Sequence, residues 1–244
     1  MLIYDIHSHL GKTSSGEENN PTQLVNELAK YNISKVGISS LSGTSTIEQN
    51  NLVYKAMCEY PDKIEGYCFI NPKDKNAINE IDRCLGDYKM NGVKFHSWKH
   101  GYYPDNCPQL EDIFKAVSSY KVHVQCHSGT APMATPFTWA RWARKFPNID
   151  FLFTHTGYYE FGYSCIEAVK DIPNIFVETS GQMEVEVLRK AIDILGSNRV
   201  VFGVDWPYKI TNIEIEKFHE LNLSDSDLEN IFYKNAMYLW RYSK

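Results

Sequence analysis

Four histidines and one aspartate have side chains that commonly bind a metal ion. His7 and His9 lie two residues apart near the N-terminus, and the other three are spread along the chain at His127, His155 and Asp205. Neutral imidazole nitrogens and carboxylate oxygens are ligands for zinc and similar divalent ions. We therefore predict a metal centre, provided that the fold brings these five side chains to one place.

Each of the five residues follows a short apolar segment that we interpret as a strand. Successive strand residues point to opposite faces, so His7 and His9 point the same way and Asp5 lies below them. A His-x-His pair alone is a weak indication, because a histidine at a strand end is often a satisfied core or surface residue. The whole set, at the same end of regularly spaced strands, is much more specific.

Eight such segments recur along the chain, and stretches of helical period lie between them. We expect strands to begin near Leu2, Lys35, Ile64, Asn91, Lys121, Asp150, Asn174 and Arg199. Their separations are close to one βα unit each, and eight units in about 250 residues predict a closed (β/α)8 TIM barrel. An open doubly wound sheet is the alternative, but residues 5–9 occupy the place of its Gly-rich phosphate turn.

Composition indicates one globular domain over residues 1–244. The chain has 25 Lys+Arg and 30 Asp+Glu, a formal net charge of −5 that is spread evenly and gives no electrostatic footprint for nucleic acid or an anionic membrane. The first residues do not look like a signal peptide, and no apolar run is long enough to cross a bilayer. The six cysteines have no CxxC pairing. We expect a cytoplasmic protein with reduced thiols.

The motifs around these residues resemble the amidohydrolase superfamily, and within it the branch called amidohydrolase family 2. The resemblance spans nearly the whole chain, and the order of its motifs is more specific than any one of them. The motifs are Asp5-Ile6-His7-Ser8-His9, Gly92-Val93-Lys94-Phe95-His96, Cys126-His127-Ser128-Gly129, Thr154-His155-Thr156-Gly157, Gly203-Val204-Asp205-Trp206-Pro207 and Asn235-Ala236-Met237-Tyr238-Leu239-Trp240.

The resemblance implies a role for each residue of the set. His7, His9 and His127 become metal ligands, and Asp205 becomes a fourth ligand or the base beside the metal. His155 becomes a ligand of a second ion or a residue that polarises or protonates the substrate. Lys94 occupies the strand on which two-metal relatives carry a carboxylated lysine, and it is either such a bridge or a plain cation near the site. We favour one ion, zinc before manganese or iron.

Two enzymatic functions follow from these roles. A bound divalent ion lowers the pKa of its water from ~15.7 towards ~7, and Asp205 can take up the proton, which predicts hydrolysis of an amide, lactone or ester-like bond of a small molecule. The alternative in the same branch is a non-oxidative decarboxylase of a small aromatic or unsaturated acid. A third interpretation is a catalytically inactive barrel that binds a small ligand.

Loops that follow the strands carry many aromatic residues. In a barrel these loops share the face on which active sites are built, and an aromatic rim with polar edges suits a small-molecule pocket. Lys99 and Arg141 are candidates for binding an anionic group, and Glu178 is either a substrate contact or part of a salt bridge. The sequence leaves a homodimer open. The pocket candidates are His96, Trp98, Tyr158 and Trp206.

Overall fold

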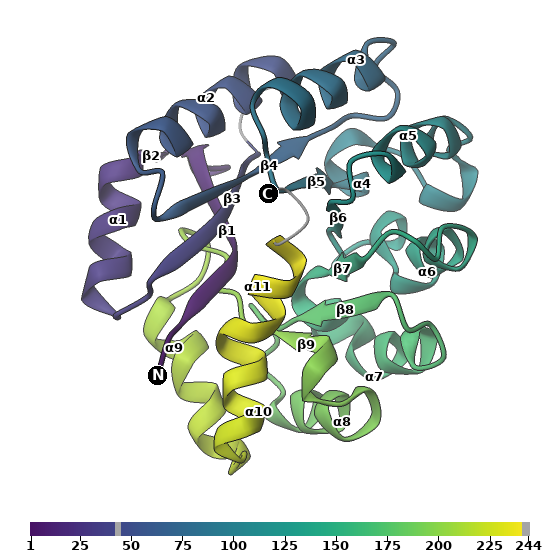
Figure 1. Ribbon diagram of the computed structural model, residues 1–244. Coiled ribbons are helices and arrows are strands. Elements are labelled where there is room, and N and C mark those ends of the chain that lie inside the picture. The colour runs from purple at the N-terminus through teal and green to yellow at the C-terminus, as the bar shows by residue number, and fades with distance from the viewer. Residues whose placement is uncertain (42–44, 241–244) are drawn as a thin grey trace.

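The computed structural model describes residues 1–41 and 45–240, so that residues 42–44, in the loop expected after the strand that begins near Lys35, lie outside the described part. The fold is α/β: a curled nine-stranded sheet has helices packed around its outside (Figure 1). The strand order is β2-β1-β3-β4-β5-β6-β7-β8-β9, and every neighbouring pair is parallel except β1 with β2. Among the described residues, no helix is long and apolar enough to cross a membrane.

The eight parallel strands begin within two residues of the predicted positions. The ninth strand, β2, was not predicted; it is a two-residue segment, Glu18–Asn19, that pairs with the end of β1. The parallel strands are β1 (Tyr4–Lys12), β3 (Lys35–Ser40), β4 (Ile64–Phe69), β5 (Gly92–Phe95), β6 (His123–Cys126), β7 (Phe151–Phe153), β8 (Ile175–Glu178) and β9 (Val200–Val201).

Local sequence signals explain where the helices begin. At the start of α1 the Asn20 side chain accepts from the Gln23 N–H while the Gln23 side chain accepts from the Asn20 N–H, a reciprocal cap, and Pro21 suits the first turn. The helices are α1 (Pro21–Lys30), α2 (Thr46–Glu59), α3 (Ala77–Ile81), α4 (Ser97–His100), α5 (Gln109–Ser118), α6 (Pro136–Lys145), α7 (Tyr158–Val169), α8 (Val185–Leu195), α9 (Thr211–Glu216), α10 (Asp225–Glu229) and α11 (Asn235–Trp240).

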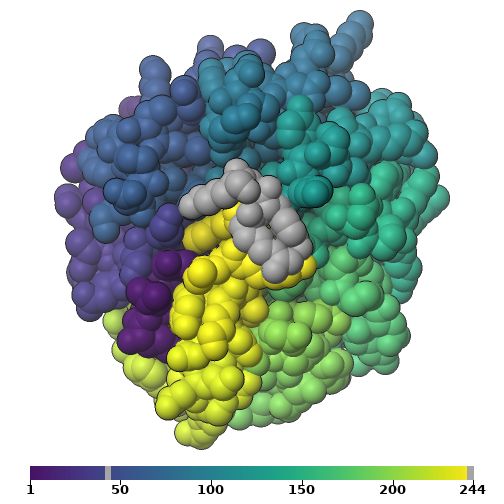
Figure 2. Space-filling view, in the orientation of Figure 1, coloured from purple at the N-terminus to yellow at the C-terminus, as the bar shows by residue number. Residues whose placement is uncertain are grey.

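The strands are buried on both faces. One set of side chains packs outward against the helices, as Phe151 and Phe153 do in β7, and a second, smaller cluster joins Leu152 to α11. Figure 1 shows α11 lying across the middle of the ring of strands, and the space-filling view shows the C-terminal helices filling that face (Figure 2). The Trp240 indole donates to the Tyr67 hydroxyl at 2.8 Å. This end of the sheet is therefore packed, and a site must lie at the other end.

The segment after β9 runs beside β1. The Ile6 N–H donates to the Phe202 carbonyl at 3.1 Å, and the His9 N–H donates to the Trp206 carbonyl at 2.7 Å. The Asp205 N–H also donates to the His7 carbonyl. These bonds bring the predicted motifs at residues 5–9 and 203–207 together although about 200 residues separate them in the chain.

Candidate active site

The predicted site residues lie at one end of the sheet. His7 and His9 belong to β1 and Lys94 belongs to β5. The remaining residues come just after their strands and, like the first three, are buried; they are His127 after β6, His155 after β7 and Asp205 after β9. Parallel strands present their carboxyl ends at the same edge, which is why residues so far apart in sequence meet here.

His7, His9 and Asp205 form a compact group whose candidate ligand atoms all lie within 4.8 Å of one another. One carboxylate oxygen of Asp205 is 3.1 Å from His9 Nε2 and 3.8 Å from His7 Nε2. Burial raises the pKa of the Asp205 carboxyl to about 7. Two imidazoles and a carboxylate are a donor set that fits a divalent ion such as zinc or manganese.

The second nitrogen of each imidazole in this group has its own partner. His9 Nδ1 lies 3.1 Å from the Ser39 carbonyl, which can only accept, so Nδ1 donates and Nε2 keeps its lone pair towards Asp205. His7 Nδ1 lies 2.9 Å from a carboxylate oxygen of Glu178. Metal-binding histidines usually donate their other N–H to a carbonyl or carboxylate in this way, which supports the fit of the group to an ion.

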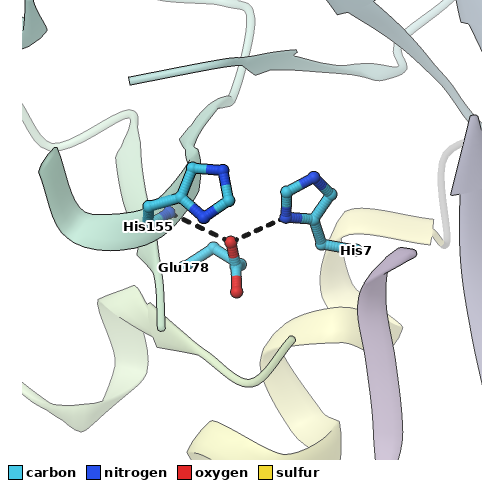
Figure 3. Close-up of side chains that lie close together, drawn as sticks. All are labelled: His7, His155 and Glu178. Carbon is cyan, nitrogen blue, oxygen red and sulfur yellow. Dashed lines mark hydrogen bonds and ion pairs between the residues drawn. The ribbon is translucent and has the colours of Figure 1, made fainter. Parts of the chain in front are cut away.

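Glu178 joins two of the predicted histidines from below. Figure 3 shows its carboxylate accepting from the His7 ring at 2.9 Å and from the His155 main-chain N–H at 3.1 Å. The Ser180 hydroxyl and main-chain N–H donate to the same carboxylate. Burial raises the pKa of Glu178 to about 7. From the sequence, Glu178 was either a substrate contact or part of a salt bridge. In the structure its carboxylate contacts the His7 ring and orients it.

His155 lies in a strained turn, Thr154–Gly157, immediately after β7. Its φ is +66°, and those of Thr156 and Tyr158 are also positive, which is costly for residues with a side chain. His155 Nδ1 donates to the Ser180 carbonyl at 3.0 Å, and its ring stacks on Tyr158 with the centroids 3.9 Å apart. Burial holds the pKa of His155 well below its usual range, so the ring is neutral.

His127, the third predicted ligand, lies beside the His7–His9–Asp205 group and not within it. Its ring stacks on His96 with the centroids 3.9 Å apart, and its Nε2 is 3.3 Å from the Thr130 hydroxyl. The centroid of its ring is 5.1 Å from that of His155. The structure thus brings three of the four predicted metal ligands within range of one ion and leaves His127 against the neighbouring wall.

Lys94 is completely buried beneath the group. Its ammonium nitrogen lies 3.1 Å from His7 Nε2, the nitrogen that would face an ion. Burial lowers the pKa of Lys94 to about 8, although the charges of Asp205 and Glu178 oppose the shift. A lysine in this place competes with a metal ion for the same lone pair.

A cavity of about 390 Å³ opens above these residues. His96, Trp98 and Tyr158, three of the four pocket candidates, line it. Trp206 is not among the described lining residues; it packs against the hydrophobic core, and its neighbours Tyr208 and Lys209 line the cavity in its place. The remaining lining residues are His9, Ser14, Leu41, Lys99, His127, His155 and Asp205. Sequence reasoning missed Lys209 because nothing in a loop sequence tells which of its side chains point inward.

Comparison with known proteins gives a matching family model and a short match to a decarboxylase. A family model described as amidohydrolase matches residues 38–242. The gamma-resorcylate decarboxylase of Rhodococcus jostii (strain RHA1) is 37% identical over 68 residues, which cover 28% of this chain and 21% of that protein. The match therefore spans only about a fifth of that relative's length.

Two solved structures share the fold over their whole length. A dihydroxybenzoic acid decarboxylase from Polaromonas sp. JS666, with bound manganese and the inhibitor 2-nitroresorcinol, has a TM-score of 0.78 at 16% identity and covers 100% of this chain and 98% of its own. A probable 2-pyrone-4,6-dicarboxylic acid hydrolase from Acinetobacter baumannii, with citric acid bound, has a TM-score of 0.78 at 17% identity, with coverages of 99% and 100%. At such identities the likeness concerns the fold alone.

Proposed function

Because the chain belongs to the amidohydrolase family, as its motifs predicted, we propose that it is a metal-dependent, non-oxidative decarboxylase of a small aromatic or otherwise unsaturated acid. The observation that carries the proposal is the group of His7, His9 and Asp205 beside a cavity that also holds two lysines. The similar proteins from Rhodococcus and Polaromonas, which are decarboxylases of hydroxylated benzoic acids, support it. Hydrolysis, which the sequence favoured, becomes the second candidate.

One divalent ion completes the proposed site. We assign His7, His9 and Asp205 to hold it and His127, whose ring lies beside this group, to complete the set as the fourth ligand, with Lys94 and His155 next to it. When bound, the ion supplies positive charge that stabilises negative charge developing on the substrate. Manganese is the ion to load first, because the Polaromonas structure contains it. The comparisons give no support to the predicted preference for zinc.

The cavity residues provide what the reaction needs besides the ion. Decarboxylation breaks the bond between the ring and its carboxyl group, releases carbon dioxide and leaves a proton on the ring carbon. We assign the delivery of that proton to Asp205, which lines the cavity. His155 donates through Nδ1 to Ser180, so its other nitrogen is an acceptor for a substrate hydroxyl. The rings of Trp98 and Tyr158 suit a flat substrate.

The second candidate is the hydrolysis of a lactone. The similar fold of the Acinetobacter protein, a probable hydrolase of a pyrone dicarboxylic acid, favours this reaction over hydrolysis of an amide. Asp205 would then act as the base that takes a proton from water. The same cavity residues could serve both reactions. Only identification of the reaction products distinguishes decarboxylation from lactone hydrolysis.

We also propose that the sheet closes into a (β/α)8 barrel and that the chain is a single domain. The hydrogen bonds of Ile6 and His9 to Phe202 and Trp206 support closure, because they join the first parallel strand to the segment after the last one. A closed barrel leaves no free edge on the parallel sheet.

The test of the proposed reaction is a product analysis in heavy water. Manganese-loaded protein is incubated with gamma-resorcylate, with a hydroxylated benzene-1,3-dicarboxylate and with a pyrone lactone, and carbon dioxide, the ring product and the ring-opened acid are measured. We expect carbon dioxide together with deuterium at the vacated ring carbon, and at least a hundredfold lower rate in Asp205→Asn. Ring opening of the lactone without release of carbon dioxide would establish the hydrolase instead.

A further inference from the structure

Two lysines line the cavity without a carboxylate to neutralise them. Lys99 comes from α4, which follows β5, and Lys209 comes from the loop after β9. Among the residues that the structure describes, no salt bridge involves either ammonium group. The one acidic residue of the cavity wall is Asp205, which we assign to the ion. The cavity therefore has an excess of positive charge before any metal is added.

Lys209 is held in place by its neighbours. Its ammonium nitrogen lies 5.3 Å from the centroid of the Tyr158 ring. Gly181 makes room for this arrangement, since a Cβ there would lie 2.7 Å from the Tyr158 ring and 2.9 Å from Lys209 Cε. Gly181 also has a φ of +67°, which disfavours other residues. The missing side chain and the positive φ of Gly181 thus allow the Lys209 ammonium to lie against Tyr158 at the wall of the cavity.

Lys99 stands on a different wall from Lys209. Burial lowers the pKa of Lys99, and no nearby carboxylate offsets the shift. Beyond burial, the main cause, the charge of Lys99 lowers the pKa of His9 and His96. The charge of Lys209 acts on His155 and Asp205 instead. Both charges also lower the pKa of His127, and the strands that precede the two lysines, β5 and β9, are separated by β6, β7 and β8 in the sheet.

We infer that Lys99 and Lys209 bind two acidic groups of one substrate, which is consequently a dianion: a ring that carries two carboxylates. This inference rests on the proposed function only in taking the cavity as the substrate site. Lys209 is half-buried and Lys99 is more exposed, and both line the cavity beside a single carboxylate, so that a monoanion could offset the charge of only one of the two lysines. A cavity of about 390 Å³ lies within the usual range for small ligands, so it has room for one ring.

A binding experiment tests the inference without requiring turnover. The dissociation constants of benzene-1,3-dicarboxylate and benzoate, which differ by one carboxylate, are measured by calorimetry on the manganese-loaded full chain. We expect the dicarboxylate to bind at least tenfold more tightly. Lys99→Met and Lys209→Met should each reduce this preference to less than threefold. Lys115→Met, which removes an exposed lysine of α5 paired with Asp112, should leave it unchanged.

Metal content and melting temperature, measured for each variant, identify any variant that has lost its ion or its fold; for such a variant Lys→Gln is used. Equal affinity for the two acids in the wild-type protein overturns the inference, and so does a preference that survives both substitutions. Failure of the proposed reaction is recognised separately: no carbon dioxide is released while the dicarboxylate preference persists. If monocarboxylic acids release carbon dioxide and the dicarboxylate binds no more tightly than benzoate, the inference of a dianionic substrate is wrong. The proposed decarboxylation is then still supported.

Discussion

At the scale of single residues, the site depends on partners that hold the imidazoles in one orientation. Glu178 is completely buried and accepts from His7 Nδ1, so that Nε2 of His7 faces Asp205. Outer partners of this kind typically change metal affinity ten- to a hundredfold when they are lost. Such partners do not touch the metal ion, but they fix the histidine tautomer whose free nitrogen can bind it.

We predict that Glu178→Gln weakens manganese binding by about ten- to a hundredfold, because an amide places either a second donor or a weaker acceptor against His7 Nδ1. Titration of the metal-free protein with manganese measures the effect. Glu186→Gln on the outer surface of α8 is the matched control, since Glu186 is exposed and pairs with Arg189. Unchanged affinity in Glu178→Gln would remove Glu178 from the metal centre.

For Lys94 we expect the opposite effect: its replacement should strengthen metal binding. Its ammonium lies 3.1 Å from His7 Nε2, where it repels a divalent ion and competes for the lone pair. Lys94→Met fills the same space without charge, so we expect tighter manganese binding with the content remaining near one ion per chain. Elemental analysis and titration measure both. A loss of metal in Lys94→Met would instead identify the lysine as a ligand, as in the two-metal alternative.

At the scale of elements, α9 and the residues after it reach into the loop that carries Ser180. Lys217 Nζ donates to the carbonyls of Thr179 at 2.8 Å and Gln182 at 3.2 Å and forms an ion pair with Glu214. Glu214 in turn accepts from the Gly181 N–H at 3.1 Å. Ser180, inside this loop, is the partner of His155. A buried ion pair thus fixes the turn on which the His155 ring depends.

Replacing one member of this pair should be much more harmful than replacing both. Lys217→Met leaves the Glu214 carboxylate buried without its partner, and we expect a loss of about 3 to 5 kcal/mol in the free energy of unfolding. In Glu214→Leu/Lys217→Met the uncompensated charge is gone, so stability should return to within about 1 kcal/mol of the wild type. Urea unfolding of the wild type, Lys217→Met, Glu214→Leu and the double variant measures this, and strictly additive effects of the two single substitutions would contradict it.

The elements themselves could be predicted well from the sequence. Strands of a parallel sheet are short apolar segments that end at polar loops, and the run at Phe151 to Phe153 needs no tertiary information to be recognised. The turn that holds His155 could not be predicted, because its positive φ angles are imposed by contacts with β8 and Ser180. The short strand β2 was equally hidden, since two residues carry no periodic pattern.

At the scale of the whole molecule, chain order along the sheet could be predicted and side-chain direction could not. Regular spacing was enough to expect that His7, His9 and Asp205 meet, and they do so. The same reasoning expected His127 in the group, but its ring stacks on His96. Loop conformation decided the rest: Lys209 points into the cavity, whereas Trp206 packs on the core.

Acidification should destabilise the whole fold through a histidine far from the cavity. His123, at the start of β6, is completely buried against the Tyr67 ring, in a space that Gly92 leaves open: a Cβ on Gly92 would lie 2.8 Å from the His123 ring. Burial lowers the pKa of His123 to about 4 from an unfolded value near 6.5. Between these values the unfolded chain binds more protons than the folded one, so stability falls as the pH is lowered through this window.

We therefore expect the loss of unfolding free energy between pH 7 and pH 5 to be smaller in His123→Gln than in the wild type, by roughly 1 to 2 kcal/mol. Glutamine is similar in size and does not titrate. Urea unfolding at both pH values, with equal manganese loading, isolates this difference from the contributions of the site histidines, which the two proteins share. His219→Gln is the control, because His219 is exposed. Equal losses in His123→Gln and the wild type would mean that His123 is already charged in the folded protein, which its complete burial argues against.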